Sequence, residues 1–370
     1  PAISRHLWNT WVKTFPTDPD ISQRDQRWMR AALALAGRGV GRVWPNPAVG
    51  CILVQAGKFD RVVGRGWTLP GGRPHAETEA LARAGDQARG ATAYVTLEPC
   101  AHTGETAPCA DALIDAGVSR VVVAQEDPGP RVAGGGIERM RKAGIAVDVG
   151  CEMASARLVN AGFLSRIECG RPWVALKAAT TLDGKIATPS GHSQWITGPE
   201  ARARGHLLRA RFDAILTGTG TANADNPRLT CRLAGLQNRS PVPVVMVGKT
   251  RLDPASHLAS SGYTRVYGDG TRPEPKTVLA DLASTGITRV LIEAGPGIAA
   301  AFLERDLIDE IHWFRAPTVM GGDGLAAIGE LGHDNADLLR AFDLAEHYTV
   351  GIDSYDILRR REPNMAHTGD

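Results

Sequence analysis

The sequence predicts an α/β protein built from two domains. Its 370 residues exceed the usual size of a single hydrophobic core. Helix-like segments alternate with short apolar strand-like segments in both halves of the chain, which is typical of mostly parallel sheets covered by helices. Glycine and proline interrupt this alternation at residues 168–172, so we place a first domain at 21–168 and a second at 169–363.

The first domain is expected to open with a helix and a hairpin. Helical periodicity over 25–37 ends at glycines, and two apolar runs, 49–55 and 61–67, flank an Ala-Gly-Lys turn. The alternating elements that follow are helix 76–84, strand 93–97, helix 109–116, strand 120–124, helix 136–143 and strand 145–149. A helical stretch at 153–163 leads to the boundary, and residues 1–20 are expected to form an N-terminal extension.

The second domain repeats the alternation, beginning with a strand at 173–177. Thr197 and Glu200 have the spacing of a capping box, which predicts a helix from Pro199 or Glu200 to about Arg211. A strand at 214–217 leads into a glycine- and threonine-rich turn and then a loop that carries Asp225. The elements expected after it are strands near 242–247, 264–267 and 290–292 and a helix at 298–305.

Composition indicates an ordinary globular protein. Hydrophobic residues make up 43% of the chain and charged residues 22%. A net charge of +2 does not suggest a nucleic-acid binder, and no apolar run reaches the length of a membrane span. The N-terminus does not resemble an export signal, and the six cysteines show no disulfide framework. We therefore expect a cytoplasmic protein with free thiols.

A few residues of the first domain carry the chemistry of a metal site. His75 and Glu77 stand two positions apart, and Cys100 and Cys109 follow, each directly after a proline. Three such ligands suit a catalytic zinc, which keeps one position for water and lowers the pKa of that water. Zinc deaminases have the signature H-x-E followed by P-C-x-x-C, with the glutamate as acid and base. In this chain the second cysteine comes late, after the loop 101–108.

The predicted elements support a metal site over simple packing. Cys100 follows a strand, whereas His75 and Cys109 each open a helix. At Cys109 the unpaired amides and the helix dipole favour a thiolate. Two alternatives remain open. One is a pair of buried structural cysteines beside a hydrogen-bonded histidine, and the other is a closed structural zinc site with His102 as fourth ligand.

Short motifs along residues 23–361 resemble, in the same order, those of the bifunctional riboflavin-biosynthesis enzymes. They are Pro-Asn-Pro-Ala-Val-Gly at 45–50, His-Ala-Glu at 75–77, Thr-Leu-Glu-Pro-Cys at 96–100 with Cys109, Thr-Leu-Asp-Gly-Lys at 181–185, Ser-Gln-Trp-Ile-Thr at 193–197 and Glu-Ala-Gly-Pro at 293–296. A delayed second cysteine is the rule in that family. The resemblance implies a cytidine-deaminase-like three-layer domain followed by a dihydrofolate-reductase-like α/β domain.

The resemblance also implies two consecutive reactions. A diamino-ribosylamino-pyrimidinone 5′-phosphate loses its 2-amino group as ammonia at a zinc site, and NADPH then reduces the ribosyl chain to ribityl. The implied ligands are one Zn²⁺, NADPH and a small phosphorylated pyrimidine, with neither nucleic acid nor membrane as a partner. The exposed edges of such sheets also favour a homodimer or homotetramer.

Residue roles follow from the resemblance together with the chemistry of each side chain. His75, Cys100 and Cys109 would hold zinc, and Glu77 would move protons. The residues implied to contact substrate are Asn46, His102, Lys177, Ser193, Thr197, Arg209, Leu229, Arg232 and Glu293. Those implied to contact NADPH are Ala179, Trp195, Thr221, Asp225, Gly295, Pro296 and Gly297.

Several of these assignments have simpler alternatives. The two arginines suit a phosphate because guanidinium pairs bidentately, but they could also lie on a solvated face. The run Gly295-Pro296-Gly297 could offer amides to cofactor phosphates or form a plain strand-to-helix turn. Asn46 could be a turn residue with a structural role alone, and His102 could be an exposed loop residue.

The chain departs from the family pattern at two positions, and two other functions are open. Thr68 stands where a substrate-contacting histidine is common, and Glu105 stands where lysine or arginine is usual. Arg73 could supply the missing positive charge. The competing functions are a zinc deaminase for another nucleobase or nucleotide with a non-catalytic second domain, and a non-catalytic binding protein stabilised by zinc.

Overall fold

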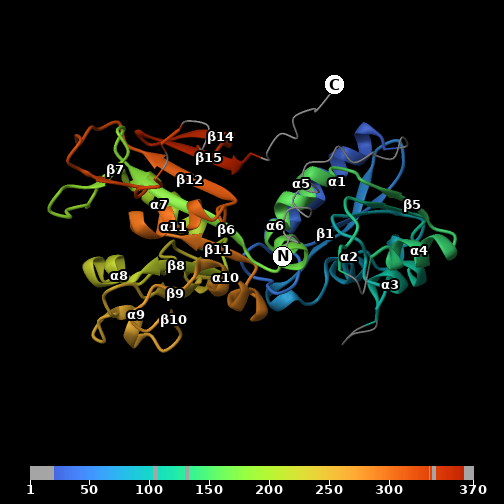
Figure 1. The fold of residues 1–370 in the computed structure, drawn as a ribbon. Helices are drawn as coiled ribbons and strands as arrows, with labels where there is room; N and C mark the ends of the chain where they lie inside the picture. The colour runs from blue at the N-terminus through green and yellow to red at the C-terminus, as the bar shows by residue number, and fades with distance from the viewer. Residues whose placement is uncertain (1–20, 103–106, 130–132, 333, 336–338, 362–370) are drawn as a thin grey trace, which may run out of the picture. The chain divides into compact units, whose positions relative to one another are not determined.

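The computed structural model describes residues 21–102, 107–129, 133–332, 334–335 and 339–361 (Figure 1). The expected extension at 1–20 and Glu105 lie outside these residues. The chain separates into two compact units, with the division between Gly170 and Arg171. Among the described residues, no helix is both long enough and apolar enough to span a membrane.

The first unit is organised around a five-stranded sheet in the order β2-β1-β3-β4-β5. Its strands are β1 (Gly50–Gln55), β2 (Arg61–Trp67), β3 (Thr92–Val95), β4 (Arg120–Val123) and β5 (Ala146–Val149). β1 pairs antiparallel with β2 and β3, and β3, β4 and β5 run parallel. The hairpin and the alternation predicted from the sequence are both present.

Helices cover both faces of this sheet, giving three layers. They are α1 (Gln23–Ala36), α2 (Ala76–Ala84), α3 (Cys109–Asp115), α4 (Gly135–Lys142), α5 (Met153–Val159) and α6 (Ala161–Cys169). Residues of α1 and α5 share one buried cluster with the sheet, and residues of α2, α3 and α4 share another. The helical stretch expected at 153–163 is present, but it is divided at Asn160 into α5 and α6, and α6 continues to Cys169.

Glycines in the hairpin let α2 lie directly on the sheet. A Cβ at Gly64 would stand 2.2 Å from the carbonyl oxygen of Ala80, and a Cβ at Gly66 would stand 2.1 Å from that of Ala76. These distances are far below contact, so only glycine permits this packing. The position of α2, which opens with the candidate metal ligand His75, therefore depends on β2 lacking side chains at these points.

The second unit contains an eight-stranded sheet in the order β10-β9-β8-β11-β6-β12-β15-β14. Its strands are β6 (Trp173–Thr180), β8 (Ala214–Gly218), β9 (Val242–Met246), β10 (Arg265–Tyr267), β11 (Arg289–Ile292), β12 (Glu310–Arg315), β14 (Phe342–Val350) and β15 (Asp353–Arg360). The strands from β10 to β12 run parallel, and β15 and β14 add antiparallel. A two-stranded ribbon of β7 (Lys185–Ala187) and β13 (Leu325–Ala326) is separate.

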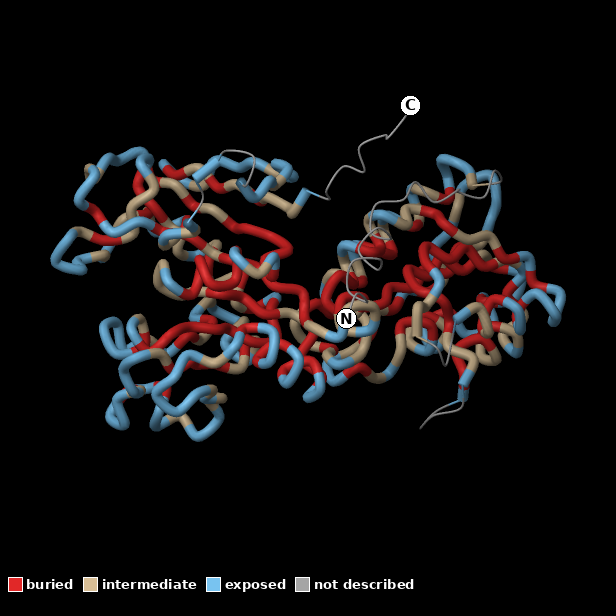
Figure 2. The backbone as a smooth tube through the Cα atoms, in the orientation of Figure 1, coloured by how far each residue is buried: buried red, intermediate tan, exposed pale blue. Residues whose placement is uncertain are grey.

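The helices of this unit are α7 (Pro199–Arg209), α8 (Thr219–Asp225), α9 (His257–Ser260), α10 (Pro275–Ser284) and α11 (Pro296–Glu304). Ala201 and Leu208 of α7 share a buried cluster with Ala175 of β6, Phe314 of β12 and Tyr355 of β15. Figure 2 shows that buried backbone concentrates in the sheets and the helices against them within each unit. Helix α7 thus covers the sheet around β6.

Two sequence predictions for this unit were wrong. The capping box at residues 197–200 does not form, because Gly198 is the N-cap of α7 and no side chain caps it. The loop expected to carry Asp225 is instead the end of α8, whose Ala222 packs in the core. Its run of threonine, glycine, asparagine and aspartate has low helix propensity, so tertiary packing outweighs local preference.

Candidate active sites

His75, Cys100 and Cys109 form a compact cluster in the first unit. Nδ1 of His75 lies 3.3 Å from Sγ of Cys109 and 3.8 Å from Sγ of Cys100. The potential ligand atoms of the three residues all lie within 4.8 Å of one another. His102, considered as a fourth ligand, is exposed and is not part of the cluster. Among the described residues these three nitrogen and sulfur donors have no fourth protein ligand beside them, which fits a catalytic zinc rather than a closed structural one.

Each ligand is delivered by the end of an element. His75 is the N-cap of α2, Cys109 is the first residue of α3, and Cys100 lies in the loop after β3. The backbone N–H of Cys109 donates to Sγ of Cys100 at 3.3 Å. Hydrogen bonding from the Cys109 thiol is the main reason that the pKa of Cys100 falls to about 4, and the same contact raises the pKa of Cys109 well above its usual value. A thiolate is the form that binds a metal, so this environment prepares Cys100 as a ligand.

Glu77 lies beside the cluster in a buried position. It is in the first turn of α2, and only 3% of its surface is exposed. Burial raises the pKa of its carboxyl group to about 7, against the opposing effect of hydrogen bonding and of His75. A carboxyl group that changes protonation near neutral pH is suited to general acid–base work. A purely structural site would have no use for it.

Glu98 holds the loop that contains Cys100, a role that the sequence prediction missed. Its buried carboxylate accepts hydrogen bonds from the backbone N–H groups of Asp127, Gly134, Gly136 and Ile137, at 2.8–3.2 Å. The last three belong to the start of α4, where a negative charge is favourable. The sequence feature that could have revealed this role is the position of Glu98 between a buried strand and Pro99-Cys100, because a buried carboxylate without a partner is costly there.

The turn that carries Asn46 is fixed from two sides. The side chain of Asn160 accepts from the N–H of Ala48 at 2.8 Å and donates to its carbonyl at 3.1 Å. Asn46 packs over Gly72, where a Cβ would stand 1.9 Å from Nδ2 of Asn46. Thr68 is buried and accepts from the N–H of Val49 at 2.9 Å, so it supports the backbone next to the turn.

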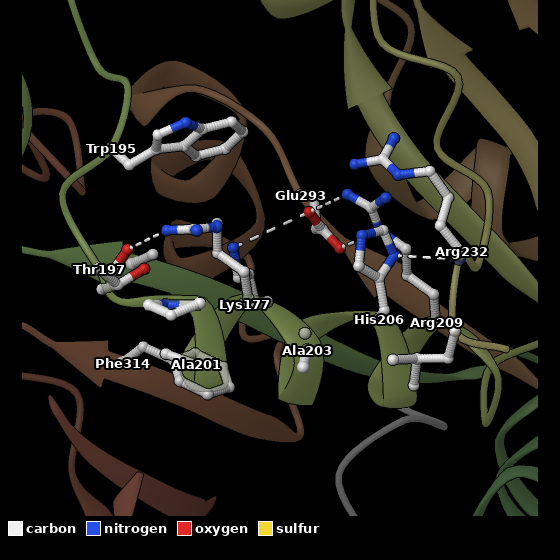
Figure 3. Close-up of a pocket in the computed structure, with 15 residues that line it drawn as sticks. Lys177, Trp195, Thr197, Ala201, Ala203, His206, Arg209, Arg232, Glu293 and Phe314 are labelled. Carbon is white, nitrogen blue, oxygen red and sulfur yellow. Dashed lines mark hydrogen bonds and ion pairs between the residues drawn. The ribbon is translucent and has the colours of Figure 1, made fainter. Parts of the chain in front are cut away.

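In the second unit, a pocket of about 400 Å³ lies between α7 and the sheet (Figure 3). It brings together seven of the residues proposed from the sequence, namely Lys177, Ala179, Trp195, Thr197, Arg209, Arg232 and Glu293. The other residues that line it are Pro199, Ala201, Arg202, Ala203, Gly205, His206, Leu233 and Phe314. It combines an aromatic part with a strongly charged part, as a site for a charged organic substrate requires.

A buried ion-pair network lies in this pocket. Arg209 pairs bidentately with Glu293, through Nε and Nη2 at 2.9 Å each, and donates from Nη1 to the carbonyl of Thr230 at 3.1 Å. Nζ of Lys177 lies 3.9 Å from the same carboxylate. Burial opposes ionisation of Glu293, but Arg209 and Lys177 outweigh it and lower the pKa to about 2. Glu293 is therefore an anion at neutral pH.

Another set of predicted residues gathers where β8 and β11 end. Gly295 is the N-cap of α11 and Pro296 its first residue, and a Cβ at Gly295 would lie 3.5 Å from Oγ1 of Thr221. Nη1 of Arg272 donates to the carbonyl of Gly297 at 3.2 Å. This arrangement places a helix N-terminus, a hydroxyl group and a guanidinium side by side, a suitable environment for phosphate.

Three predicted residues belong neither to the pocket lining nor to this second set. Leu229 is buried in the core with a φ of 54°, so its side chain faces other apolar groups. Ser193 is partly exposed and Asp225 is exposed. Conversely, the sequence prediction missed Arg202 and His206, which line the pocket. Helical spacing could have indicated both residues, because positions 202, 206 and 209 lie on one face of α7 and Arg209 was already a candidate.

Comparison with known proteins identifies both halves of the chain. The cytidine and deoxycytidylate deaminase zinc-binding region matches residues 22–125, and the RibD C-terminal domain matches residues 172–354. The riboflavin biosynthesis protein RibD of Escherichia coli K12 is 42% identical over 332 residues, covering 81% of this chain and 89% of that protein. The chain belongs to the RibD family of riboflavin biosynthesis proteins.

Solved RibD structures agree with the fold. Acinetobacter baumannii RibD matches with a TM-score of 0.83 and 38% identity, over 92% of this chain and 99% of that one. A Thermotoga maritima protein described as a diaminohydroxyphosphoribosylaminopyrimidine deaminase/5-amino-6-(5-phosphoribosylamino)uracil reductase matches at 0.82 and 33% identity, over 91% and 99%. Like other RibD proteins, this chain joins a cytidine-deaminase-like deaminase domain to a dihydrofolate-reductase-like reductase domain.

Proposed function

We propose that the chain catalyses two consecutive steps on a phosphorylated pyrimidine. The first is hydrolytic deamination of 2,5-diamino-6-ribosylamino-4(3H)-pyrimidinone 5′-phosphate, and the second is reduction of the ribosyl chain to ribityl by NADPH. The observation that carries the first step is the buried Glu77 beside the cluster of His75, Cys100 and Cys109. The charged pocket against α7 supports the second.

The deaminase step assigns a role to each residue of the cluster. His75, Cys100 and Cys109 would hold one zinc ion, which when bound lowers the pKa of water to near neutral. Glu77 takes a proton from the attacking water and delivers it to the pyrimidine, where the bond from carbon 2 to its amino nitrogen breaks and ammonia leaves. Its buried position shields this carboxyl group from bulk solvent.

Three further residues are proposed to bind the deaminase substrate. The Asn46 amide offers a donor and an acceptor to the pyrimidine, and its turn is held by Asn160. His102 is exposed and lies two residues after Cys100. Arg73 is partly buried and close enough to His75 to affect its pKa, so it can supply positive charge for the phosphate.

The reductase step uses the pocket against α7. We assign Lys177, Ser193, Thr197, Arg209, Leu229, Arg232 and Glu293 to the substrate. Glu293 and Lys177 can bind ribosyl hydroxyl groups. Arg232 is available to phosphate, since no described carboxylate pairs with its guanidinium. Arg209 is held by Glu293 and contributes mainly charge and position.

NADPH is proposed to lie along the ends of β8 and β11, contacting Ala179, Trp195, Thr221, Asp225, Gly295, Pro296 and Gly297. The start of α11 and the hydroxyl of Thr221 suit the cofactor phosphates. The exposed Trp195 indole, over which Arg202 stacks at 4.7 Å, offers a flat surface for a cofactor ring. Within this arrangement the protein supplies alignment and charge, while NADPH supplies the hydride.

Incubation of the protein with the pyrimidine substrate, with and without NADPH, tests both steps. Ammonia release should not depend on NADPH, whereas NADPH oxidation should require the deaminated pyrimidine. Oxidation of NADPH without ammonia release from the starting substrate would contradict the assigned order. Release of ammonia with no reduction under any condition would favour a deaminase with a non-catalytic second domain.

We further propose a cytoplasmic homo-oligomer, a dimer or tetramer, that binds neither nucleic acid nor membrane. None of the six cysteines forms a disulfide, which is compatible with a reducing compartment. β14 is the edge strand of its sheet and exposes Leu344 and Tyr348, so a second copy can cover it. The small net charge gives no electrostatic attraction for nucleic acid.

A further inference from the structure

His206 lies in the reductase pocket between the two arginines assigned to the substrate. It projects from α7 one helical turn before Arg209, and the backbone N–H of Arg232 donates to its Nδ1 at 3.4 Å. Figure 3 shows these three side chains together on one side of the pocket, away from Trp195 and Phe314. The histidine is therefore part of the most cationic region of the lining.

The contact with Arg232 determines which nitrogen of the ring carries the proton. Because Nδ1 accepts a hydrogen bond, the neutral ring must carry its proton on Nε2. Burial lowers the pKa of His206, and the neighbouring Arg209 and Arg232 lower it further, so the ring is neutral near pH 7. Nε2 then carries the proton of the ring, on a side chain that lines the pocket and also interacts with the carbonyl of Thr230.

The charge of the pocket indicates what this donor meets. Lys177, Arg202, Arg209 and Arg232 contribute four positive charges and Glu293 one negative charge, an excess of three. The negative charge of Glu293 is balanced by Arg209 and Lys177. An anionic oxygen of the ligand is thus the partner that the region around His206 favours, because it would receive hydrogen bonds from several aligned donors.

We propose that His206 is a substrate-binding residue of the reductase, and that its Nε2–H donates to the phosphate of the ribosyl substrate beside Arg232. This inference rests on the proposed function. It assigns to α7 a dual role, since Arg209 orders Glu293 while His206, one turn earlier, binds the ligand and holds the backbone of Arg232. The histidine thereby links phosphate binding to the position of the loop after Thr230.

Two substitutions separate the proposed donor from the contact with Arg232. In His206→Asn the amide can replace Nδ1 and keep the Arg232 contact, but nothing replaces Nε2. In His206→Gln the longer amide can place a donor where Nε2 stands. The measurement is the inhibition constant of ribose 5-phosphate against the pyrimidine substrate in NADPH oxidation by the full chain, with ribose as the matched ligand without phosphate. The dissociation constant of NADPH, from fluorescence, serves as the folding control.

We expect His206→Asn to raise the inhibition constant of ribose 5-phosphate roughly ten-fold, which is the loss of affinity expected for a hydrogen bond to a charged group. His206→Gln should stay within about three-fold of the wild type, with ribose and NADPH unaffected in both variants. Equal losses in the two variants, or equal losses for ribose and ribose 5-phosphate, would overturn the inference. A wild-type protein that does not oxidise NADPH would overturn the proposed function itself, whereas an active enzyme unaffected by His206→Asn would overturn this inference alone.

Discussion

Arg209 and Glu293 form a bidentate ion pair inside the reductase pocket, with both nitrogen–oxygen distances at 2.9 Å. The side chains are 15% and 12% exposed, so water screens the pair only weakly. Lys177 approaches the same carboxylate, and the pair joins α7 to the end of β11. The wall of the pocket therefore depends on one carboxylate that two cations share.

Replacing Glu293 with glutamine should destabilise the protein and abolish reduction. The substitution leaves Arg209 and Lys177 without a counter-ion, and breaking a buried pair costs on the order of 3 kcal/mol. Chemical denaturation measures this loss. Glu304→Gln is the matched control, because Glu304 pairs with Arg305 at an exposed site and should cost less than about 1 kcal/mol. Equal effects of the two changes would contradict the assigned role of Glu293.

The same pair predicts a contribution to acid sensitivity. The pKa of Glu293 falls from 4.5 to about 2 on folding. Its stabilising effect is therefore complete above about pH 4.5 and is lost as the pH falls toward 2, because the unfolded state then binds the proton more readily. The free energy of unfolding of wild type should fall more steeply than that of Glu293→Gln across this interval. Parallel pH profiles would show that the pair does not stabilise the folded state.

Asn160 should control the deaminase without affecting the reductase. Asn160→Ala removes both hydrogen bonds to Ala48 and leaves buried backbone groups without partners, at a cost of roughly 1–3 kcal/mol. Because Ala48 follows the turn that carries Asn46, the KM of deamination should rise while NADPH oxidation with deaminated substrate stays unchanged. Asn160→Asp, which keeps only the acceptor, should have an intermediate effect. An unchanged deaminase KM in both variants would separate the turn from substrate binding.

Gly66 should be required for the geometry of the metal cluster. A Cβ at this position would stand 2.1 Å from the carbonyl oxygen of Ala76, so Gly66→Ala must push the start of α2 away from β2. Such overpacking typically costs 1–3 kcal/mol, and it should also reduce zinc content because His75 precedes α2. Gly220→Ala is the control, since no atom lies within 4 Å of its Cβ position. Full zinc content in Gly66→Ala would refute this dependence.

The sequence predicted best where local pattern and tertiary structure agree. The helices and strands between residues 76 and 149 were placed to within about two residues, because each has clear periodicity and glycine or proline at its ends. The three candidate ligands were proposed from residue type and spacing, and the structure brings their side chains together. A clear local signal was thus sufficient for the first unit.

The remaining features depend on contacts distant in sequence. α8 forms from weak helix formers because Ala222 packs in the core. No strand was predicted at residues 342–350, where most residues of β14 are exposed. The pairing of Arg209 with Glu293 joins residues 84 positions apart, and no local pattern specifies it. The same holds for Glu98, whose four partners belong to a later segment.

The most direct test of the central claim is Glu77→Gln, assayed for zinc content and for both reactions. Glutamine keeps the size of the side chain but cannot exchange protons, so ammonia release should fall by roughly 10²–10⁴-fold. Zinc should remain bound, and NADPH oxidation with deaminated substrate should be unchanged. Ammonia release at the wild-type rate from protein with full zinc content would contradict the account, because Glu77 could not then be the group that moves the proton.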